Sequence, residues 1–292
     1  MAWRIYTRKD LSSLLAFLAG IEWKCVGFTS RIRESLNILW GNRTGYEILI
    51  NEEKNRGQPE VREAIMLTRY GLILPLMDPS LPCTLHHNNQ FNTLFSRYAR
   101  RLHSIMGSAD SVAKMEGLFQ KKIRARINYF LMVKDLSTFN NDIIKSIPGL
   151  TIRLARSDDA PRLYELQKRY ELEEVYVDPT YFDEERCRSL LKNNLRKQIV
   201  FLAEERGEPL SKAGTNARGF HVDQLGGVFT REDKRNRGYA YWVMATLLDY
   251  LKASRTSVSL FVKKDNPAAL ALYEKLEFES RDDFRITYYD RT

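Results

Sequence analysis

The stretch that decides the fold of this 292-residue chain is Gly227-Val-Phe-Thr-Arg-Glu-Asp-Lys-Arg-Asn-Arg-Gly-Tyr-Ala240. It predicts an apolar strand that ends near Thr230, a charged loop, and a helix that starts at about Gly238. Backbone N–H groups at a helix start are unpaired and lie at the positive end of the helix dipole, so they suit a phosphate or pyrophosphate. Glycine at 238 removes the side chain that would block close approach. Cationic side chains surround this predicted anion site: Arg231, Lys234, Arg235 and Arg237.

The segments around this turn predict a mixed α/β domain over residues 150–292. Alternating and β-branched patterns predict strands, and apolar residues at three- and four-residue steps predict helices. The strands are expected at 150–154, 199–203, 210–218, 220–230, 257–262 and 278–289. The helices are expected at 159–172, 183–195, 238–251 and 266–276. Gly207-Glu208-Pro209 is typical of a hairpin turn. The predicted order is β-α-α-β-β-β-α-β-α-β.

Two motifs in this half resemble those of the GNAT superfamily of N-acetyltransferases. Arg235-Asn-Arg-Gly-Tyr-Ala240 fits the family's acyl-CoA signature, Gln/Arg-x-x-Gly-x-Gly/Ala. Asn266-Pro-Ala-Ala-Leu-Ala-Leu-Tyr-Glu-Lys-Leu-Glu-Phe278 is similar to the family's Asn-x-x-Ala-x-x-x-Tyr-x-x-x-Gly-Phe segment, with Glu277 in place of its glycine. The resemblance implies a GNAT fold, a mixed central sheet flanked by helices. The alternative is that both segments are ordinary helices of another α/β fold.

The resemblance also implies a site for acetyl-CoA as co-substrate. Backbone N–H groups from Arg235 to Ala240 would hold the pyrophosphate. The strand before Thr230 would pair with the pantetheine arm, and one of its N–H groups would polarise the thioester carbonyl. Asn266 would fix the cofactor or a water, or else only cap its helix. The expected cofactor-binding residues are Gly227, Val228, Phe229, Thr230, Arg235, Asn236, Arg237, Gly238, Tyr239, Ala240 and Asn266.

Catalysis needs a proton donor for the departing thiolate and a route to a neutral amine. Tyr273 is at the family position that often supplies the proton, and a phenol with a pKa near 10 suits a thiolate of similar basicity. Its alternative role is a core aromatic. Asp223, acting through water, or His221, two residues earlier, is the candidate general base. A purely structural role for either, with deprotonation through water alone, stays open.

Composition limits the setting of the protein. The formal net charge is +9, and residues 1–150 hold 21 Lys+Arg against 13 Asp+Glu, whereas residues 151–292 hold 25 against 24. The cations are scattered and no nucleic-acid motif is present, which argues against a nucleic-acid partner. Three cysteines, Cys25, Cys83 and Cys187, lie far apart and in no metal-ligand spacing, which favours a reducing cytoplasm and predicts no metal site. No apolar run approaches the length of a membrane span, so no membrane partner is expected.

The first half, residues 1–140, is predicted to be a second α/β domain. Turn formers at 136–150 mark the boundary. At an offset of 155 residues, Ser104 to Asp110 lies over Ser259 to Asp265, and Gly71 to Asp78 lies over Gly226 to Asp233. Asp10, at a helix start, takes the part of Asp159. In this register Leu118 replaces Tyr273 and Ser111 replaces Asn266. We therefore expect a degenerate GNAT-like domain that has lost its acyl-CoA site; an unrelated α/β domain is the alternative.

The expected function is transfer of an acetyl group from acetyl-CoA to a primary amine by a cytoplasmic monomer or homodimer. The acceptor is a small molecule or a peptide. The acidic run Glu171-Leu-Glu-Glu174 favours a cationic amine, unless it is only a solvated helix end. Two other functions remain open: an acyl-CoA-binding regulatory protein without catalysis, and a basic scaffold.

Overall fold

The chain forms two compact units, each assembled from separate stretches of sequence. The computed structural model describes residues 2–36, 45–55, 58–83, 85, 89–140 and 148–290. Unit 1 contains Met1–Leu131, Phe261–Asp265 and Ser280–Thr292, and unit 2 contains Met132–Leu260 and Asn266–Glu279. The predicted boundary at 136–150 falls largely on residues 141–147, which lie outside the described residues.

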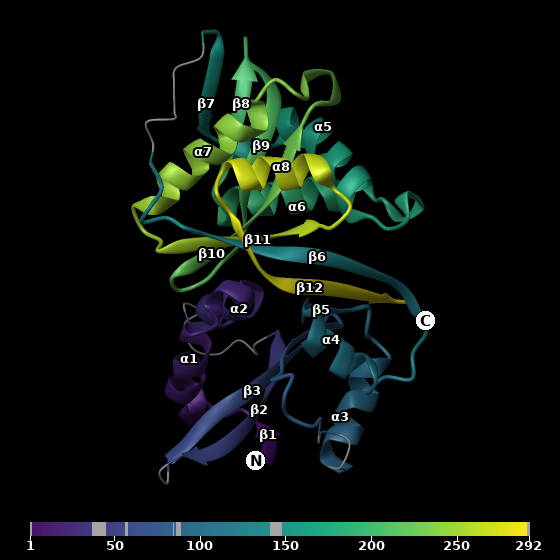
Figure 1. Cartoon of the computed structure of the whole chain (residues 1–292). Helices are drawn as coiled ribbons and strands as arrows, with labels where there is room; N and C mark the ends of the chain where they lie inside the picture. The colour runs from purple at the N-terminus through teal and green to yellow at the C-terminus, as the bar shows by residue number, and fades with distance from the viewer. Residues whose placement is uncertain are drawn as a thin grey trace. The chain divides into compact units, whose positions relative to one another are not determined.

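Residues 150–292 have the predicted order of elements, but the last predicted strand belongs to unit 1, and the others belong to unit 2 (Figure 1). Its strands are β7 Leu150–Leu154, β8 Val200–Glu205, β9 Glu208–Arg218, β10 Val222–Thr230 and β11 Ser257–Lys263. Its helices are α5 Ala160–Tyr170, α6 Glu184–Lys197, α7 Tyr239–Lys252 and α8 Pro267–Lys275. Short helical turns follow α5 and precede α7. The strand and helix predictions for this half are confirmed; only the hairpin turn lies earlier, at Arg206–Gly207, because Glu208 and Pro209 already belong to β9.

The sheet of unit 2 is mixed. Strands β7, β8, β9 and β10 pair antiparallel in that order, and β10 pairs parallel with β11. Consecutive side chains of β8 face opposite layers, as the pleat of a strand requires. Phe201 packs edge-on against Tyr250 of α7 at 5.4 Å, whereas Leu202 lies in the core with α5 and α6. The sheet is therefore covered by helices on both faces.

Unit 1 repeats this architecture. Its strands are β1 Ala2–Ile5, β2 Tyr46–Asn55, β3 Gln58–Thr68, β4 Leu72–Leu76, β5 Ser104–Ser108 and β6 Ile123–Asp135. Its helices are α1 Leu11–Ala19, α2 Val26–Leu36, α3 Asn89–Ala99 and α4 Ala109–Glu116. β1 to β4 pair antiparallel in sequence order, and β4 pairs parallel with β5. The last strand of the chain, β12 Glu279–Tyr289, pairs antiparallel with β5, and β6 follows it in the strand order.

An ion cluster at the start of each unit shows the same repeat. In unit 2, Arg153 bonds Asp159 at 2.7 Å and Glu204 at 2.9 Å. In unit 1, Arg4 bonds Asp10 at 2.7 Å and Glu52 at 2.6 Å. In both cases the arginine lies on the first strand, the aspartate at the first helix start and the glutamate on the second strand. The predicted equivalence of Asp10 and Asp159 is thus confirmed, and both halves share one fold.

The single offset of 155 residues is wrong, however. In the parallel strand pair of each unit, the first two residues that stand opposite each other are Leu72 and Ser104 in unit 1 and Val222 and Ser257 in unit 2. The offset is therefore 150 residues for the first strand of the pair and 153 for the second. The helix that follows begins after Ser108 in unit 1 and after Asn266 in unit 2. Ser108, and not Ser111, therefore stands where Asn266 stands, and Met115, and not Leu118, matches Tyr273. The loops of the two units differ in length, so no constant offset can align every element.

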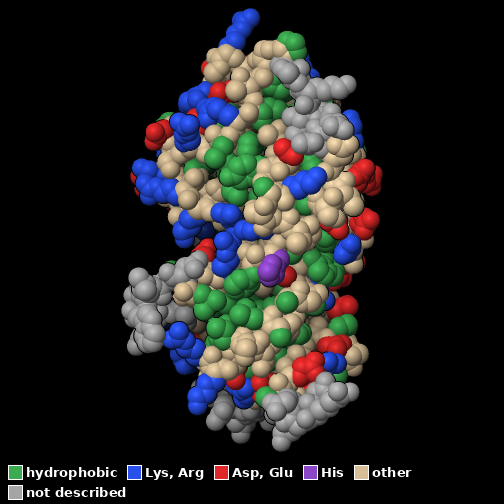
Figure 2. Space-filling model, turned by 90° about the vertical axis from the view of Figure 1, so that its left-hand side faces the viewer, with side chains coloured by type: hydrophobic (Ala, Val, Ile, Leu, Met, Phe, Trp, Pro, Cys, Tyr) green, Lys and Arg blue, Asp and Glu red, His purple; other side chains and the backbone are tan. Residues whose placement is uncertain are grey.

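Charged side chains are spread over the surface. On the face drawn in Figure 2, Lys and Arg side chains are interspersed with acidic and apolar ones rather than gathered into one basic stripe. Among the helices of the described residues, none is long and apolar enough to cross a membrane.

Candidate acyl-CoA site

The site begins where β10 and β11 separate. The two strands pair at Val222–Ser257, Asp223–Val258 and Gln224–Ser259, and their register ends there. β10 continues to Thr230 while it stays paired with β9 on its other side. Backbone N–H and C=O groups along residues 225–230 therefore face an open sheet edge on the β11 side. Such an edge is a template for an extended partner that carries amide groups.

A bulge interrupts β10 along this edge. Its register with β9 shifts between Gly226 and Phe229, so that Gly227 and Val228 stand opposite one residue of β9. Gly227 has a φ of +63°, a left-handed conformation that an L-residue with a side chain adopts only at a cost. A Cβ at Gly226 would collide with the side chain of Asn216. The two glycines therefore permit the bulge, which re-aims the backbone of β10.

The turn after β10 presents unpaired backbone N–H groups. Asn236 and Gly238 both have positive φ values, +60° and +83°. Gly238 is the N-cap of α7, is exposed, and carries no side chain over the first turn of that helix. The N–H groups of Tyr239 and Ala240 have no acceptor within the helix because they lie in its first turn. Successive N–H groups in such a turn form a concavity suited to an anion.

Most of the cations predicted around this turn are engaged with carboxylates. Arg231 bonds Asp233 at 2.7 Å, Lys234 lies 3.4 Å from Glu205, and Arg235 bonds Glu173 at 2.6 Å. Arg235 also stacks over the ring of Phe229 at 5.3 Å. Arg237 is exposed, and its side chain interacts with Tyr239 and acts electrostatically on Glu205. The attraction for an anion therefore depends chiefly on the backbone.

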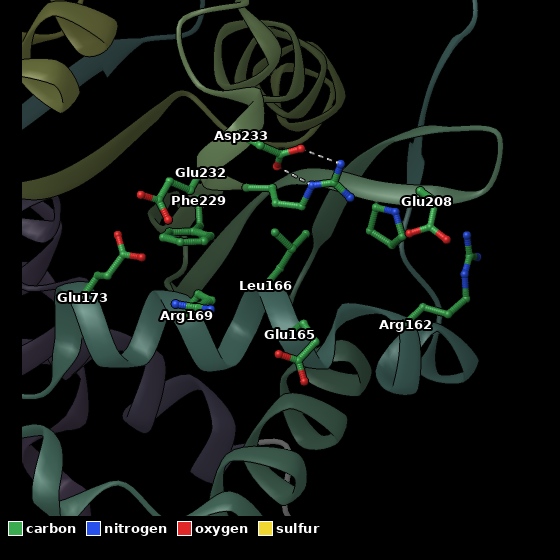
Figure 3. A pocket seen from close by; sticks show the side chains of 11 residues that line it. Arg162, Glu165, Leu166, Arg169, Glu173, Glu208, Phe229, Glu232 and Asp233 are labelled. Atoms are coloured by element: carbon green, nitrogen blue, oxygen red, sulfur yellow. Dashed lines mark hydrogen bonds and ion pairs between the residues drawn. The ribbon is translucent and has the colours of Figure 1, made fainter.

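A cavity of about 720 Å³ opens beside this turn, between α5, the β8–β9 turn and the end of β10 (Figure 3). The ring of Phe229 lies over α5, and the Arg231–Asp233 pair crosses the far side. Carboxylates outnumber guanidinium groups in its lining. The charged lining residues are Glu165, Glu173, Glu208, Glu232, Asp233, Arg162, Arg169 and Arg231.

Tyr273 is buried close to the end of α5. Its side chain is 7% exposed, and burial raises the pKa of its phenol well above the ordinary value, with smaller contributions from Tyr170 and the charge of Glu174. The phenol therefore stays protonated at neutral pH. Asn266 accepts a hydrogen bond from the Ala269 N–H at 3.0 Å and donates one to Glu174 at 3.3 Å. The helix-cap role predicted for Asn266 is thus observed, and the same side chain positions a carboxylate near Tyr273.

The two predicted base candidates lie at the start of β10. Asp223 is fully buried between two guanidinium groups, 2.9 Å from Arg255 and 3.5 Å from Arg218. These ion pairs suit a structural carboxylate. His221 lies one residue before β10 and is exposed. Asp223 is four residues from Gly227, or about 13 Å along an extended strand.

Sequence reasoning missed a buried lysine beneath the bulge. Lys212 of β9 is 4% exposed and donates a hydrogen bond to the Gly227 carbonyl at 2.8 Å. Burial lowers the pKa of Lys212 to about 8, against the opposing effect of Glu171. Its ammonium lies 4.6 Å from the ring of Tyr170. The signal was a single charged residue within 210–215, the buried middle of β9, where the other residues are small or apolar.

Comparison with known proteins agrees with this geometry. Residues 160–278 match the model of the Acetyltransferase (GNAT) family. Residues 160–278 therefore form a domain of the GNAT type. No curated protein matches the sequence significantly.

Solved structures extend the fold over both halves. A Drosophila protein is similar with a TM-score of 0.67 and 10% identity over 99% of each chain. A GCN5-related N-acetyltransferase from Sphaerobacter thermophilus gives a TM-score of 0.59 and 16% identity over 98% of this chain and 94% of its own. A tandem GNAT protein from the clavulanic acid biosynthesis pathway gives a TM-score of 0.54 and 11% identity over 100% of this chain and 98% of its own. The whole chain thus has a tandem GNAT fold.

Proposed function

We propose that unit 2 transfers an acetyl group from acetyl-CoA to a primary amine. One observation carries this proposal: the open, bulged edge of β10 runs directly into the left-handed turn at the start of α7. The pantetheine arm has amide groups that can pair with residues 227–230. The pyrophosphate is an anion that N–H groups of residues 236–240 can bind, whereas the Arg235 N–H already donates to the Glu232 carbonyl.

The side chains near the end of α5 supply the proton transfers. Tyr273 gives a proton or a hydrogen bond to the departing thiolate, which a buried and protonated phenol suits. We assign the general base to Glu174, because its charge acts on the phenol of Tyr273 and Asn266 positions it. Asp223 fits a structural ion pair instead, and exposed His221 remains the second candidate.

The cavity points to a cationic acceptor. Five carboxylates and three guanidinium groups line it. Ion pairs hold two of the carboxylates, Asp233 and Glu173, and two of the arginines, which leaves three carboxylates against one guanidinium group. The remaining negative charge attracts an amine that is protonated in solution. A polyamine or a basic peptide should therefore be a better acceptor than an acidic one of equal size.

Unit 1 supplies structure rather than a second cofactor site. β4 pairs with β3 in an unbroken register, without the bulge of β10, and contains Pro75, which has no N–H to offer. Met115 stands where Tyr273 stands in unit 2 and offers no exchangeable proton.

Titration calorimetry with acetyl-CoA and CoA tests the proposal. Gly238→Glu places an anionic side chain at the predicted pyrophosphate site, and we expect it to abolish binding of both ligands. Ala253→Glu is the matched control, because it adds the same charge at an exposed position at the opposite end of α7. Equal losses in both variants would contradict the placement.

An amine panel then follows CoA release by the wild-type protein. Cofactor binding without transfer to any amine would favour the regulatory acyl-CoA-binding protein. Absence of binding by the wild-type protein would refute the proposed function and leave the scaffold.

A further inference from the structure

Lys212 donates a hydrogen bond to the peptide group between Gly227 and Val228, in the part of β10 where the proposed chemistry needs an N–H donor. Its Nζ donates to the Gly227 carbonyl oxygen at 2.8 Å, and that oxygen belongs to the same peptide unit as the Val228 N–H. In a planar trans peptide the C=O and N–H bonds point in opposite directions. A donor on the Gly227 oxygen therefore fixes the direction of the Val228 N–H within the bulge.

A charged donor on the carbonyl oxygen also makes the N–H of the same peptide unit a stronger hydrogen-bond donor. Hydrogen bonds in a chain polarise one another, and a charge-assisted bond to a carbonyl draws electron density from the amide nitrogen. The effect is larger in a site shielded from water, and Lys212 is only 4% exposed. We infer that Lys212 is a positioning residue whose ammonium aims and polarises the Val228 N–H as the donor to the thioester carbonyl. This inference rests on the proposed function.

The surroundings of Lys212 hold the ammonium in place. The ring of Tyr170 lies 4.6 Å from Nζ, and the negative charge of Glu171 and the thiol of Cys187 act on it electrostatically. Gln167 donates to Glu171 at 2.8 Å and fixes that carboxylate. These residues come from α5, its following turn and α6, so Lys212 links the bulge of β10 to the helices of the opposite layer.

The same arrangement sets Lys212 apart from the candidate general base. Its Nζ is buried and donates to the Gly227 carbonyl oxygen, and its position is held by the ring of Tyr170. The lysine therefore acts through the backbone and not on the acceptor amine.

Nuclear magnetic resonance of the peptide group tests the inference without any cofactor. Glycine labelled with ¹³C at its carbonyl and valine labelled with ¹⁵N select the Gly227–Val228 unit. We expect its signals to shift with pH around the lowered pKa of Lys212, about 8, and this shift to vanish in Lys212→Met. Lys192→Met, which removes an exposed lysine of α6, is the matched control and should keep it.

Ligand binding and turnover give a second readout. CoA has no thioester, so Lys212→Met should weaken acetyl-CoA binding while it leaves CoA binding unchanged. Removing one oxyanion donor costs about 10²–10³ in kcat, and loss of its polarising partner should lower kcat about tenfold with the KM for the amine nearly unchanged.

Two results would overturn the inference. In the first, the Val228 signals do not respond to Lys212→Met. In the second, Lys212→Met lowers the affinities for CoA and acetyl-CoA equally, as expected of a lysine with only a structural role. If the wild-type protein binds neither ligand, the proposed function fails, and the cofactor-free resonance experiment still decides whether Lys212 controls this peptide group.

Discussion

Replacing Lys212 by methionine measures what the folded protein loses by burying an ammonium. Methionine has a similar length and no charge, so packing against Tyr170 is largely kept. Burial lowers the pKa of Lys212 from 10.5 to about 8. One pKa unit corresponds to about 1.4 kcal/mol, so the charged lysine destabilises the folded state by about 3 kcal/mol at neutral pH.

This penalty depends on pH in a defined direction. Between about pH 8 and pH 10.5 the unfolded state keeps the proton that the folded state has released, so stability increases with pH. Below pH 8 both states are protonated and the whole penalty is present; above 10.5 both are neutral and it is absent. The free energy of unfolding of wild type minus that of Lys212→Met should therefore rise by about 2.5 kcal/mol between pH 7 and pH 10.

Urea unfolding of the wild type, Lys212→Met and Lys192→Met at intervals from pH 7 to pH 10 provides the measurement. Other groups that titrate in this range are present in all three proteins and cancel in the differences. Lys192→Met should run parallel to the wild type. A wild-type-minus-Lys212→Met difference that stays constant with pH would refute the reasoning, since it would mean that Lys212 keeps an ordinary pKa when folded.

Three further predictions follow from the same contacts. Asp223→Asn should lower the free energy of unfolding by about 3–5 kcal/mol, because it leaves buried arginines without their counter-charge. If Asp223 is structural and not the general base, the folded fraction of this variant should keep its CoA affinity and its turnover. Arg153 lowers the pKa of Asp159 to about 2, so the charged carboxylate stabilises the folded protein above the ordinary carboxyl pKa. This stabilisation is lost as the pH falls towards 2. Arg153→Met should remove about 1–2 kcal/mol of it, measured by unfolding between pH 6 and pH 2. Tyr273→Phe and Glu174→Gln should each lower kcat by about 10²-fold and leave CoA binding intact; a pH–rate profile unaltered by Glu174→Gln would return the general base to His221 or to water.

Local sequence predicted the elements of unit 2 because each carries its own signal. Alternation and helical periodicity fixed the strands and helices to within a few residues, and Gly238 and Asn266 marked two helix starts through their conformational and capping preferences. The repeat in unit 1 was visible in the same way. The predicted residue offset between the two halves was wrong because the periodicity within an element carries no information about the lengths of the loops between elements.

The candidate site was predicted only as far as it is built from backbone. The turn at 235–240 depends on one glycine and on the order strand, loop, helix, all of which are local in sequence. The ion pairs of Asp223 depend on Arg218 and Arg255, which no local pattern connects to it. Glu277 adopts a φ of +60° although the resembling family has glycine there, since it bonds the buried Lys134 at 3.0 Å.

The sequence by itself determined the order of elements, the position of the turn at the start of α7 and the duplication, because these follow from short-range preferences and hydrophobic periodicity. Only the tertiary structure decided which charges are paired and which are available for chemistry. Lys212 and Gly227 are 15 residues apart and meet through strand pairing, and the effect of burial on that lysine arises only when helices of the opposite layer cover it. The last strand, β12, pairs with β5 of unit 1, and no local pattern predicts this pairing because the two strands lie far apart in the sequence.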